Sequence, residues 1–343
     1  MKYWTFAPYY GYGPGAHSFD GKDRFCNADT VSAYLDGPWK GPIPDERGAN
    51  APADEFLLTG LRLRRGITAS AYLAATGKAR PDEVLAVTFT NKAANEMKDR
   101  VGKLMEYDSR PMQVCTFHSF GLRFIFRNRS LFSLVGLKEG FAIFDRGDSR
   151  SLIKEIMEGL KMDTKQFDPG NILDRISTVK NESISGGSNS PLLEGIYGDV
   201  FRAYNQSLRK QNAVDFDDLL NLPLELLSSG DEVLGRERDR ISWVLVDEYQ
   251  DINYSQYQLI KALARKYRNV FCVGDDDQSI YRWRGADVGI ILQFEQDYPD
   301  AIVYKLEQNY RSTKKIREAA HHVVKRNSGR ATKKLWTDNA EGC

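Results

Sequence analysis

Two adjacent carboxylates, Asp247 and Glu248, follow an apolar run and precede Gln250 and Asp251. We expect the run to be a strand that delivers both carboxylates to its carboxyl end, where parallel α/β sheets hold functional residues. Asp247 suits holding Mg²⁺ through its water shell, and Glu248 suits orienting or deprotonating an attacking water. A solvated acidic turn is the simpler alternative. The presence of Gln250 and Asp251 directly after the two carboxylates makes this alternative less favoured.

A second polar segment, residues 273–286, places Gln278 after another apolar run. Its neutral amide can sense a γ-phosphate without opposing the phosphate charge. Tyr281 and Trp283 are interleaved with arginines, Arg284 among them, which suits stacking on unpaired bases while neutralising phosphates. Aromatic residues at this spacing also occur in buried strands, but the arginines make full burial unfavourable.

The segment Leu306-Glu-Gln-Asn-Tyr-Arg-Ser-Thr313 offers two more candidates. Arg311 can reach a transferring phosphoryl group as an arginine finger does, and Tyr310 suits stacking on an adenine ring. A simple helix cap explains the same residues. Alone, this segment indicates little.

Residues 88–97 and 116–119 each predict a strand that turns into a helix. The start of a helix, with hydroxyl side chains beside it, suits binding of a nucleic-acid phosphate. His118 is interpreted as a hydrogen-bonding DNA contact or a packing residue, in preference to a catalytic base. The candidates in these segments are Thr88, Phe89, Thr90, Asn91, Thr116 and His118.

Alternating elements are expected to position these residues. The apolar runs predict strands and the amphipathic runs between them predict helices, which together indicate a parallel α/β sheet. Residues 103–212 lack a comparable strand series and predict an all-helical insertion. The predicted strands are 84–90, 112–117, 243–247, 270–274 and 302–306, and the clearest helices are 91–105 and 254–266.

The composition of the 343 residues, with 41% hydrophobic and 28% charged side chains, is that of a soluble globular chain of two or three domains. No apolar stretch is long enough to span a membrane, so we expect a cytoplasmic protein. Four scattered cysteines predict neither a structural metal nor disulfides. The net charge of +1 decides nothing, and the ten Lys/Arg against four Asp/Glu in residues 301–343 equally fit a solvated helix.

In their order along the chain, TFTNKAANEM, TFHSF, VDFDDLL, VLVDEYQD, GDDDQSIYRWRGA and LEQNYRS resemble the motifs of the UvrD/Rep/PcrA family of superfamily 1 DNA helicases. The resemblance implies a 3′-to-5′ translocase that uses ATP and Mg²⁺ and binds single-stranded and duplex DNA. It also implies a RecA-like first motor domain interrupted by a helical subdomain. The expected division is 67–102 and 213–300 for that domain, 103–212 for the insertion, which begins with the TFHS strand, and 301–343 for the start of a second, truncated motor domain.

The phosphate-binding loop GxxxxGK[ST], which such a motor needs to hold ATP phosphates, does not occur in the sequence. The expected first strand is also missing. Residues 1–66 are irregular and rich in Pro and Gly, and they contain Tyr9-Tyr-Gly-Tyr-Gly-Pro-Gly-Ala-His-Ser-Phe19, Arg24, Asn27 and Thr59-Gly-Leu-Arg-Leu-Arg-Arg-Gly66. These segments resemble a HemN/HemW-type radical-SAM coproporphyrinogen-oxidase-like family, without its CxxxCxxC cluster motif. Both resemblances break near residue 67, which indicates a join between two unrelated reading frames or genes, by natural fusion, gene decay or an artefact of sequence assembly.

Three functional hypotheses follow. The first is a helicase by descent that hydrolyses ATP poorly because it lacks the loop and the second motor domain. The second is a non-catalytic single-strand-binding fragment, and the third, which we consider improbable, is radical chemistry by residues 1–66. A sheet without its first strand can also leave backbone groups unpaired, so that the chain does not fold stably.

Overall fold

A computed structural model describes residues 79–104, 112–163, 166–182, 190–229, 235, 238–281, 285–326, 333 and 335–342. It also describes the backbone of three short strands nearer the N-terminus. The chain divides into two compact units, one made of residues 1–86, 90–115 and 241–245 and the other of residues 87–89, 116–240 and 246–343. Every site contact described below between different elements lies within the second unit.

A four-stranded sheet has the order β5-β4-β8-β9. Its strands are short because each is an apolar run that ends at a polar or glycine residue. The backbone N of Ser242 donates to the carbonyl of Glu83, and the backbone N of Asp247 donates to the carbonyl of Val87. Residue numbers therefore rise in the same direction along β4 and β8, so the two strands are parallel. The bounds are β4 Val84–Thr88, β5 Gln113–Thr116, β8 Trp243–Val246 and β9 Val270–Cys272.

The α/β class and four of the five predicted strands are confirmed. The fifth, 302–306, is wrong, because the structure forms no strand there and leaves Ile302 70% exposed. Apolar β-type residues predict a strand only where a neighbouring strand can pair with them. In the described part of this region, the only bridge joins Gln308 to Trp336.

Helices follow the strands directly. The helix α4, Asn91–Leu104, comes after β4, and α5, Phe117–Arg127, comes after β5. The helix α11, Tyr254–Ala264, begins at Asn253, whose side-chain oxygen accepts from the backbone N of Gln256 in a capping box. Both clearly predicted helices are therefore present.

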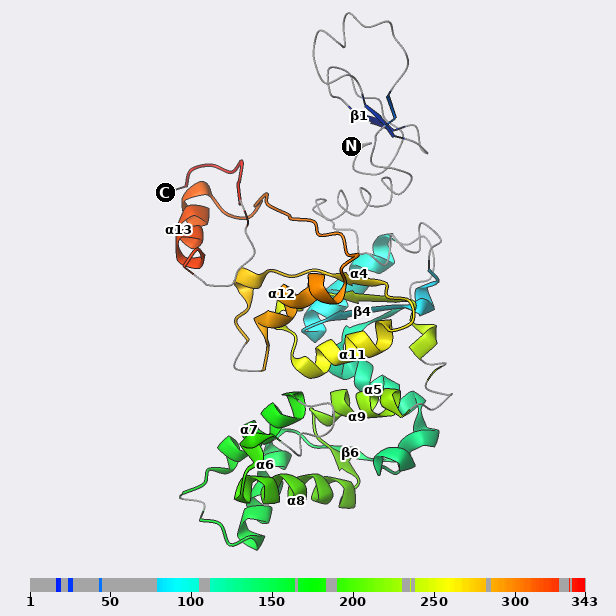
Figure 1. Ribbon diagram of the computed structural model, residues 1–343, viewed down its shortest axis with the longest axis vertical. Coiled ribbons are helices and arrows are strands. Elements are labelled where there is room, and N and C mark those ends of the chain that lie inside the picture. The colour runs from blue at the N-terminus through cyan, green and yellow to red at the C-terminus, as the bar shows by residue number, and fades with distance from the viewer. Residues whose placement is uncertain are drawn as a thin grey trace, which may run out of the picture. The chain divides into compact units, whose positions relative to one another are not determined.

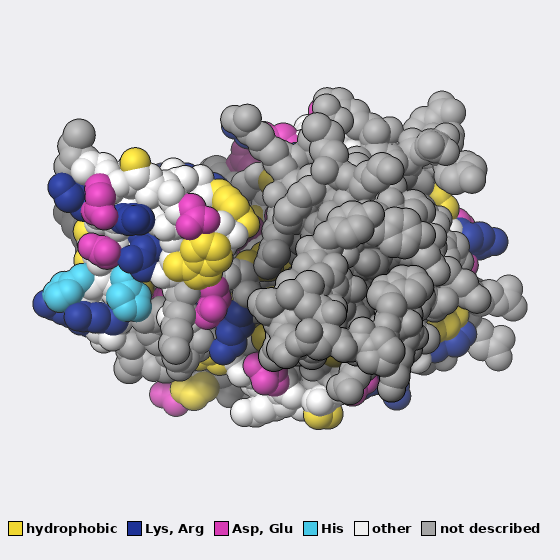
Figure 2. All heavy atoms as spheres, turned by 90° about the horizontal axis from the view of Figure 1, so that it is seen from above, with side chains coloured by type: hydrophobic (Ala, Val, Ile, Leu, Met, Phe, Trp, Pro, Cys, Tyr) yellow, Lys and Arg dark blue, Asp and Glu magenta, His cyan; other side chains and the backbone are white. Residues whose placement is uncertain are grey.

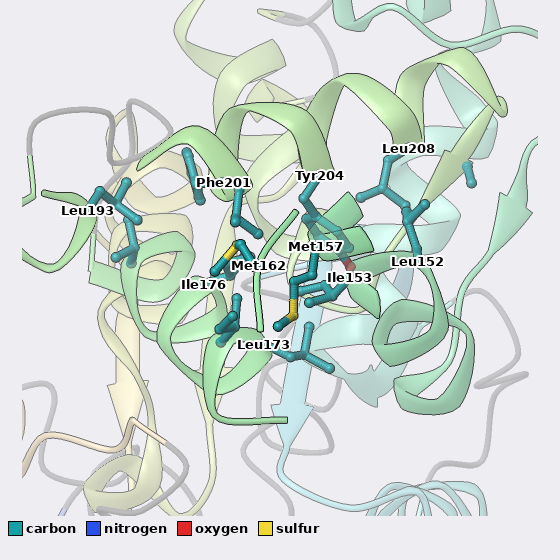
Figure 3. Close-up of a cluster of buried hydrophobic side chains, with 14 residues drawn as sticks. Leu152, Ile153, Met157, Met162, Leu173, Ile176, Leu193, Phe201, Tyr204 and Leu208 are labelled. Carbon is teal, nitrogen blue, oxygen red and sulfur yellow. The ribbon is translucent and has the colours of Figure 1, made fainter. Parts of the chain in front are cut away.

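Three helices share a core of their own in the second unit (Figures 1 and 3). They are α6 Arg146–Gly159, α7 Pro169–Glu182 and α8 Ile196–Lys210. Each turns one apolar face inward, so that Ile153, Ile176 and Tyr204 are buried together. Two short parallel strands, β6 Ala142–Ile143 and β7 Ala213–Val214, lie at the two ends of this stretch of chain.

The helix α9, Asp218–Ser228, packs against α5, α7 and α11. Its contact with α5 is close at Gly121, where a Cβ atom would lie 1.8 Å from the carbonyl oxygen of Leu219. Only glycine allows this approach. The fold thereby joins the three-helix core to the helix that follows β8.

Two further helices are α12 Val288–Asp297 and α13 Lys314–Val324. All described side chains of α13 are exposed or half-buried, and its basic and histidine side chains gather on one lobe of the surface (Figure 2). Near the N-terminus, β1 His17–Phe19, β2 Arg24–Cys26 and β3 Ile43–Pro44 pair antiparallel in the order β1-β2-β3. The rest of the fragment 1–66 lies outside the described residues.

Among the described helices, none is long and apolar enough to cross a membrane. Of the described cysteines, Cys115 is buried and Cys272 half-buried, and neither is in a disulfide.

Candidate nucleotide and DNA site

Asp247 lies directly after β8, half-buried and facing the end of β4. Its carboxylate accepts a hydrogen bond of 3.2 Å from the hydroxyl of Thr88, which is fully buried. Burial, and next the charge of Glu248, raise the pKa of Asp247, while the Thr88 bond opposes the rise. Two carboxylates that are costly to ionise side by side suit a divalent cation, whose charge offsets theirs. The Thr88 hydroxyl therefore donates to Asp247, whereas the sequence suggested that it contacts a DNA phosphate.

Glu248 is exposed and adopts a left-handed backbone conformation, with φ 52° and ψ 46°. This conformation is uncommon in residues other than glycine, and among the described residues Lys161, Asn212 and Arg268 also have a positive φ. Nε2 of the buried Gln250 donates a 2.7 Å hydrogen bond to Oε2 of Glu248, and its Oε1 accepts one of 2.9 Å from the backbone N of Asp275. A Cβ atom on Gly274 would lie 2.9 Å from that Oε1, so glycine allows the approach.

Gln278 is exposed, and its Nε2 donates a 2.6 Å hydrogen bond to Oδ2 of Asp275. The ammonium group of Lys333 pairs with Asp275 and also with the next two aspartates, Asp276 and Asp277. Burial raises the pKa of Asp275, but the bonds from Lys333 and Gln278 outweigh burial and lower it overall. A continuous hydrogen-bonded path therefore runs from Glu248 through Gln250 and Asp275 to Lys333, with Gln278 attached to it.

Phe89 and Tyr281 stack on each other, with ring centroids 4.9 Å apart and planes 25° apart. Both side chains are half-buried. They follow β4 and the Gln278 segment, and the structure thereby unites two aromatic candidates 192 positions apart in the sequence (281 − 89). Trp283 and Arg284 lie outside the described residues.

Thr90 and Asn91 are exposed at the start of α4, where the Thr90 hydroxyl accepts a 3.1 Å bond from the backbone N of Ala93. Thr116 caps α5 in the same way, accepting from the backbone N of Ser119 at 3.3 Å. Both hydroxyls therefore stabilise helix starts. A phosphate contact by these residues stays a prediction.

His118 is half-buried, and burial lowers its pKa, so the imidazole is neutral at neutral pH. Its ring meets the ring of Phe216 edge to face, at a centroid distance of 5.8 Å. Phe216 is 52% exposed, so solvent reaches this pair from the Phe216 side. The pair offers a second aromatic surface for an unpaired base.

Tyr310 and Arg311 are exposed in the turn before α13. The side chain of Asn309 closes that turn by accepting from the backbone N of Arg311 at 3.0 Å. Among the described residues, no hydrogen bond joins this turn to Asp247, Glu248 or Gln278. The phosphate contact of Arg311 and the adenine contact of Tyr310 stay predictions.

Three residues of this region were not predicted as site residues from the sequence: Gln250, Lys333 and Phe216. Gln250 stood inside the recognised carboxylate motif, and Phe216 inside the VDFDDLL block, so both had a sequence signal. Lys333 had none, because its partners lie more than fifty residues earlier.

Residues 67–299 match the model of the UvrD/REP helicase N-terminal domain. The chain belongs to the UvrD/REP helicase family. The matched segment contains the β8 carboxylates, Gln278 and both aromatic pairs, while Tyr310 and Arg311 lie beyond it.

Curated relatives agree with this family. The ATP-dependent DNA helicase PcrA of Bacillus subtilis (strain 168) is 45% identical over 276 residues, which are 79% of this chain and 37% of that protein. PcrA of Leuconostoc citreum is 42% identical over 267 residues, 76% of this chain and 35% of that protein. PcrA of Staphylococcus aureus (strain Mu50) is 42% identical over 276 residues, which are 79% of this chain and 37% of that protein. The match therefore spans little more than a third of the length of these relatives.

Proposed function

We propose that the chain is, by descent, an ATP-dependent 3′-to-5′ DNA translocase of the UvrD type. We further propose that these 343 residues bind single-stranded DNA but hydrolyse ATP weakly or not at all. One observation carries the proposal. The Asp247–Thr88 pair at the ends of β8 and β4 directly precedes, along β4, the Phe89–Tyr281 stack. The carboxylate suited to a nucleotide metal and the ring suited to a base thus contact two consecutive residues at the end of β4.

The metal-binding side of a nucleotide site fits the residues present. Asp247 would hold Mg²⁺, whose charge stabilises a transferring phosphoryl group when it is bound. Glu248, held by Gln250, would orient a water and accept its proton if ATP and the metal were bound. Gln278, held by Asp275, presents an uncharged amide toward a terminal phosphate.

The phosphate-binding side does not fit. The 343 residues contain no GxxxxGK[ST] segment, and therefore no lysine and hydroxyl placed to hold the β- and γ-phosphates. Because these groups supply much of the affinity for ATP, we derive no hydrolytic step for this chain. The carboxylates remain while the cradle for their substrate is absent.

The domain organisation is part of the same proposal. Residues 67–102 and 213–300 form a RecA-like motor domain, 103–212 a helical insertion that begins with the TFHS strand, and 301–343 the start of a second motor domain. The support is that β4, β8 and β9 belong to one sheet although α6, α7 and α8 stand between β4 and β8 in the chain. The strand of the TFHS segment, β5, pairs with β4 in the same sheet, so the helical part of the insertion begins after it.

Phosphate release from ATP, measured with and without unpaired DNA, tests the catalytic part. We expect the purified chain to release little phosphate under both conditions, and Glu248→Gln to change that background little. DNA-stimulated turnover at a rate typical of helicases, abolished by Glu248→Gln, would show that the chain holds ATP phosphates by other groups. The catalytic part of the proposal would then be wrong.

Binding to unpaired DNA without nucleotide tests the other part. The missing phosphate loop favours a non-catalytic single-strand-binding role, since aromatic stacking and phosphate neutralisation need no ATP. Affinity that falls with added salt and on Trp283→Ala supports this role. Affinity that depends on added ATP contradicts it.

A further inference from the structure

A cluster of polar side chains is buried where the last turn of α7 meets α9 and α11. Lys180 is only 3% exposed, and its ammonium group donates to Asp215 at 2.7 Å and to Asp218 at 2.9 Å. Burial lowers the pKa of Lys180, but Asp218 and Asp215 outweigh it and raise the pKa overall. A buried charge is tolerated only when it is paired in this way. The loop from Asp215 to Asp218 is thereby fixed against α7.

Asn181, the next residue, joins two segments that are distant in the sequence. Its Nδ2 donates to Oδ1 of Asp217 at 2.9 Å, and its Oδ1 accepts from Nδ2 of Asn253 at 2.7 Å. The orientation of both amides is determined, because Oδ1 of Asn253 already accepts from the backbone N of Gln256. Asn253 must therefore donate to Asn181, which leaves the Asn181 nitrogen for the carboxylate.

One end of this bridge holds the loop that presents Phe216. Asp215 and Asp217 flank Phe216 and are both held from α7, so the exposed ring stands on a loop fixed at either side. Tyr204 adds a further bond to Asp215, of 3.1 Å. The position of the Phe216 ring beside His118 therefore depends on these buried bonds.

The other end holds the junction behind the nucleotide-side carboxylates. Asn253 comes two residues after Asp251 and starts α11, and it forms an antiparallel bridge with Ala286, just beyond the segment of Gln278 and Tyr281. Ser255 strengthens the junction, because its hydroxyl contacts the carbonyl of Asn181 at 3.2 Å. One carboxamide thus lies between the Phe216 loop and the segments that carry Glu248 and Tyr281.

Directional bonds distinguish this junction from ordinary packing. Apolar side chains of similar volume commonly stabilise a buried junction as well as polar ones do. Fully satisfied polar networks instead fix one arrangement of the elements they join. Asn181 satisfies both halves of its amide across α7, the Phe216 loop and the start of α11.

We propose that Asn181 is a positioning residue for DNA binding, whose amide sets the Phe216 loop relative to the segment that carries Tyr281. The proposal rests on the proposed binding of unpaired DNA by these aromatic residues. Asn181 itself touches no DNA. When the Asn181 amide is removed, Phe216 and Tyr281 are still present, but the distance between the segments that carry them is no longer fixed.

The test is the affinity of the full chain for a fluorescent oligothymidylate, measured by anisotropy well below the melting temperature. We expect Asn181→Ala to weaken binding on the order of three- to tenfold. This is the effect expected when one hydrogen bond is lost and its buried partner is left unpaired. The matched control is Asn205→Ala, since Asn205 is also partly buried but its amide bonds only to Phe201 within α8. The control is expected to bind as the wild type does.

Two comparisons separate positioning from a merely structural role. In a Phe216→Ala background, Asn181→Ala should cause little further loss, because the contact through which it acts is already gone. Asp217→Asn, which keeps an acceptor for the Asn181 amide, should bind more tightly than Asp217→Ala. If Asn181→Ala does not fold, the Asp217 pair decides the question.

The proposal is overturned if folded Asn181→Ala binds like the wild type, if its loss is undiminished in the Phe216→Ala background, or if the two Asp217 variants bind alike. Failure of the proposed function itself gives a different result. In that case the wild-type chain does not bind the oligothymidylate, or Phe89→Ala and Phe216→Ala both leave its binding unchanged.

Discussion

Gln250 joins the two strand ends of the candidate site, donating from Nε2 to Glu248 at 2.7 Å and accepting at Oε1 from the backbone N of Asp275 at 2.9 Å. A neutral, buried side chain therefore positions both the glutamate proposed to act on water and the segment that carries Gln278.

Replacing Gln250 with leucine is expected to lower the free energy of unfolding by about 1–3 kcal/mol, because the backbone N–H of Asp275 loses its partner. Urea denaturation followed by circular dichroism measures the change. Gln278→Leu is the matched control, since Gln278 is exposed and its loss should cost little. Equal losses in the two variants would contradict the bridging role of Gln250.

Lys333→Met is expected to destabilise the chain at neutral pH and hardly at all in acid. Asp275 has a lowered pKa in the folded state, so its pairing contributes stability above its ordinary pKa, and this contribution is lost as pH falls through the lowered folded-state value. Thermal melting of both proteins between about pH 3 and pH 7 checks this dependence. Lys325→Met, at an exposed position after α13, is the control. A difference from the wild type that is constant with pH would contradict the assignment.

Asp217→Asn is expected to stabilise the chain near pH 7 by on the order of 1–3 kcal/mol relative to its effect near pH 4. Burial, and next the charge of Asp215, raise the pKa of Asp217 to about 6. The folded state therefore binds this proton more tightly than the unfolded state, so stability attributable to Asp217 is present in acid and is lost as pH rises to about 6. Urea titrations at both pH values measure the difference. Greater stabilisation in acid than at neutral pH would contradict the sign.

Gly121→Ala is expected to cost on the order of 3 kcal/mol, because α5 and α9 must separate to admit the methyl group. The control is Gly159→Ala at the end of α6, where an added Cβ meets nothing within 4 Å. Alanine there should be neutral or stabilising, since it favours helix. Similar melting temperatures for the two variants would show that the α5–α9 contact yields more easily than the structure indicates.

The sequence predicted the sheet well where apolar runs end in polar residues, as at Asp247 and Asn91. The spacing of the apolar residues and the polar residues that end each run are both visible in a short stretch of sequence. Strands of this kind can therefore be predicted without knowledge of the fold. The predicted strand 302–306 failed because its residues have the right types but the described structure offers them no partner. Strand formation is decided by the neighbour as well as by the run.

The site was predictable to the extent that its residues stand at strand ends. That reasoning proposed Asp247, Glu248, Gln278, Phe89 and Tyr281 as site residues, but not which of them touch. The Thr88 hydroxyl was assigned to the outside because threonine before a helix often binds phosphate, whereas burial directs it to Asp247. Lys333 and Asn181 act only through residues far away in the sequence, and no local pattern indicates such partners.

The most direct test of the account is the binding of a labelled oligothymidylate to the 343-residue chain without nucleotide. The account predicts salt-dependent binding that Phe89→Ala and Tyr281→Ala each weaken by roughly fivefold to a hundredfold, as expected when one base loses its stacking partner. Tyr267→Ala, at an exposed tyrosine after α11, should have no effect. Absence of binding by the folded chain, or binding that both Phe89→Ala and Tyr281→Ala leave unchanged, would contradict the account.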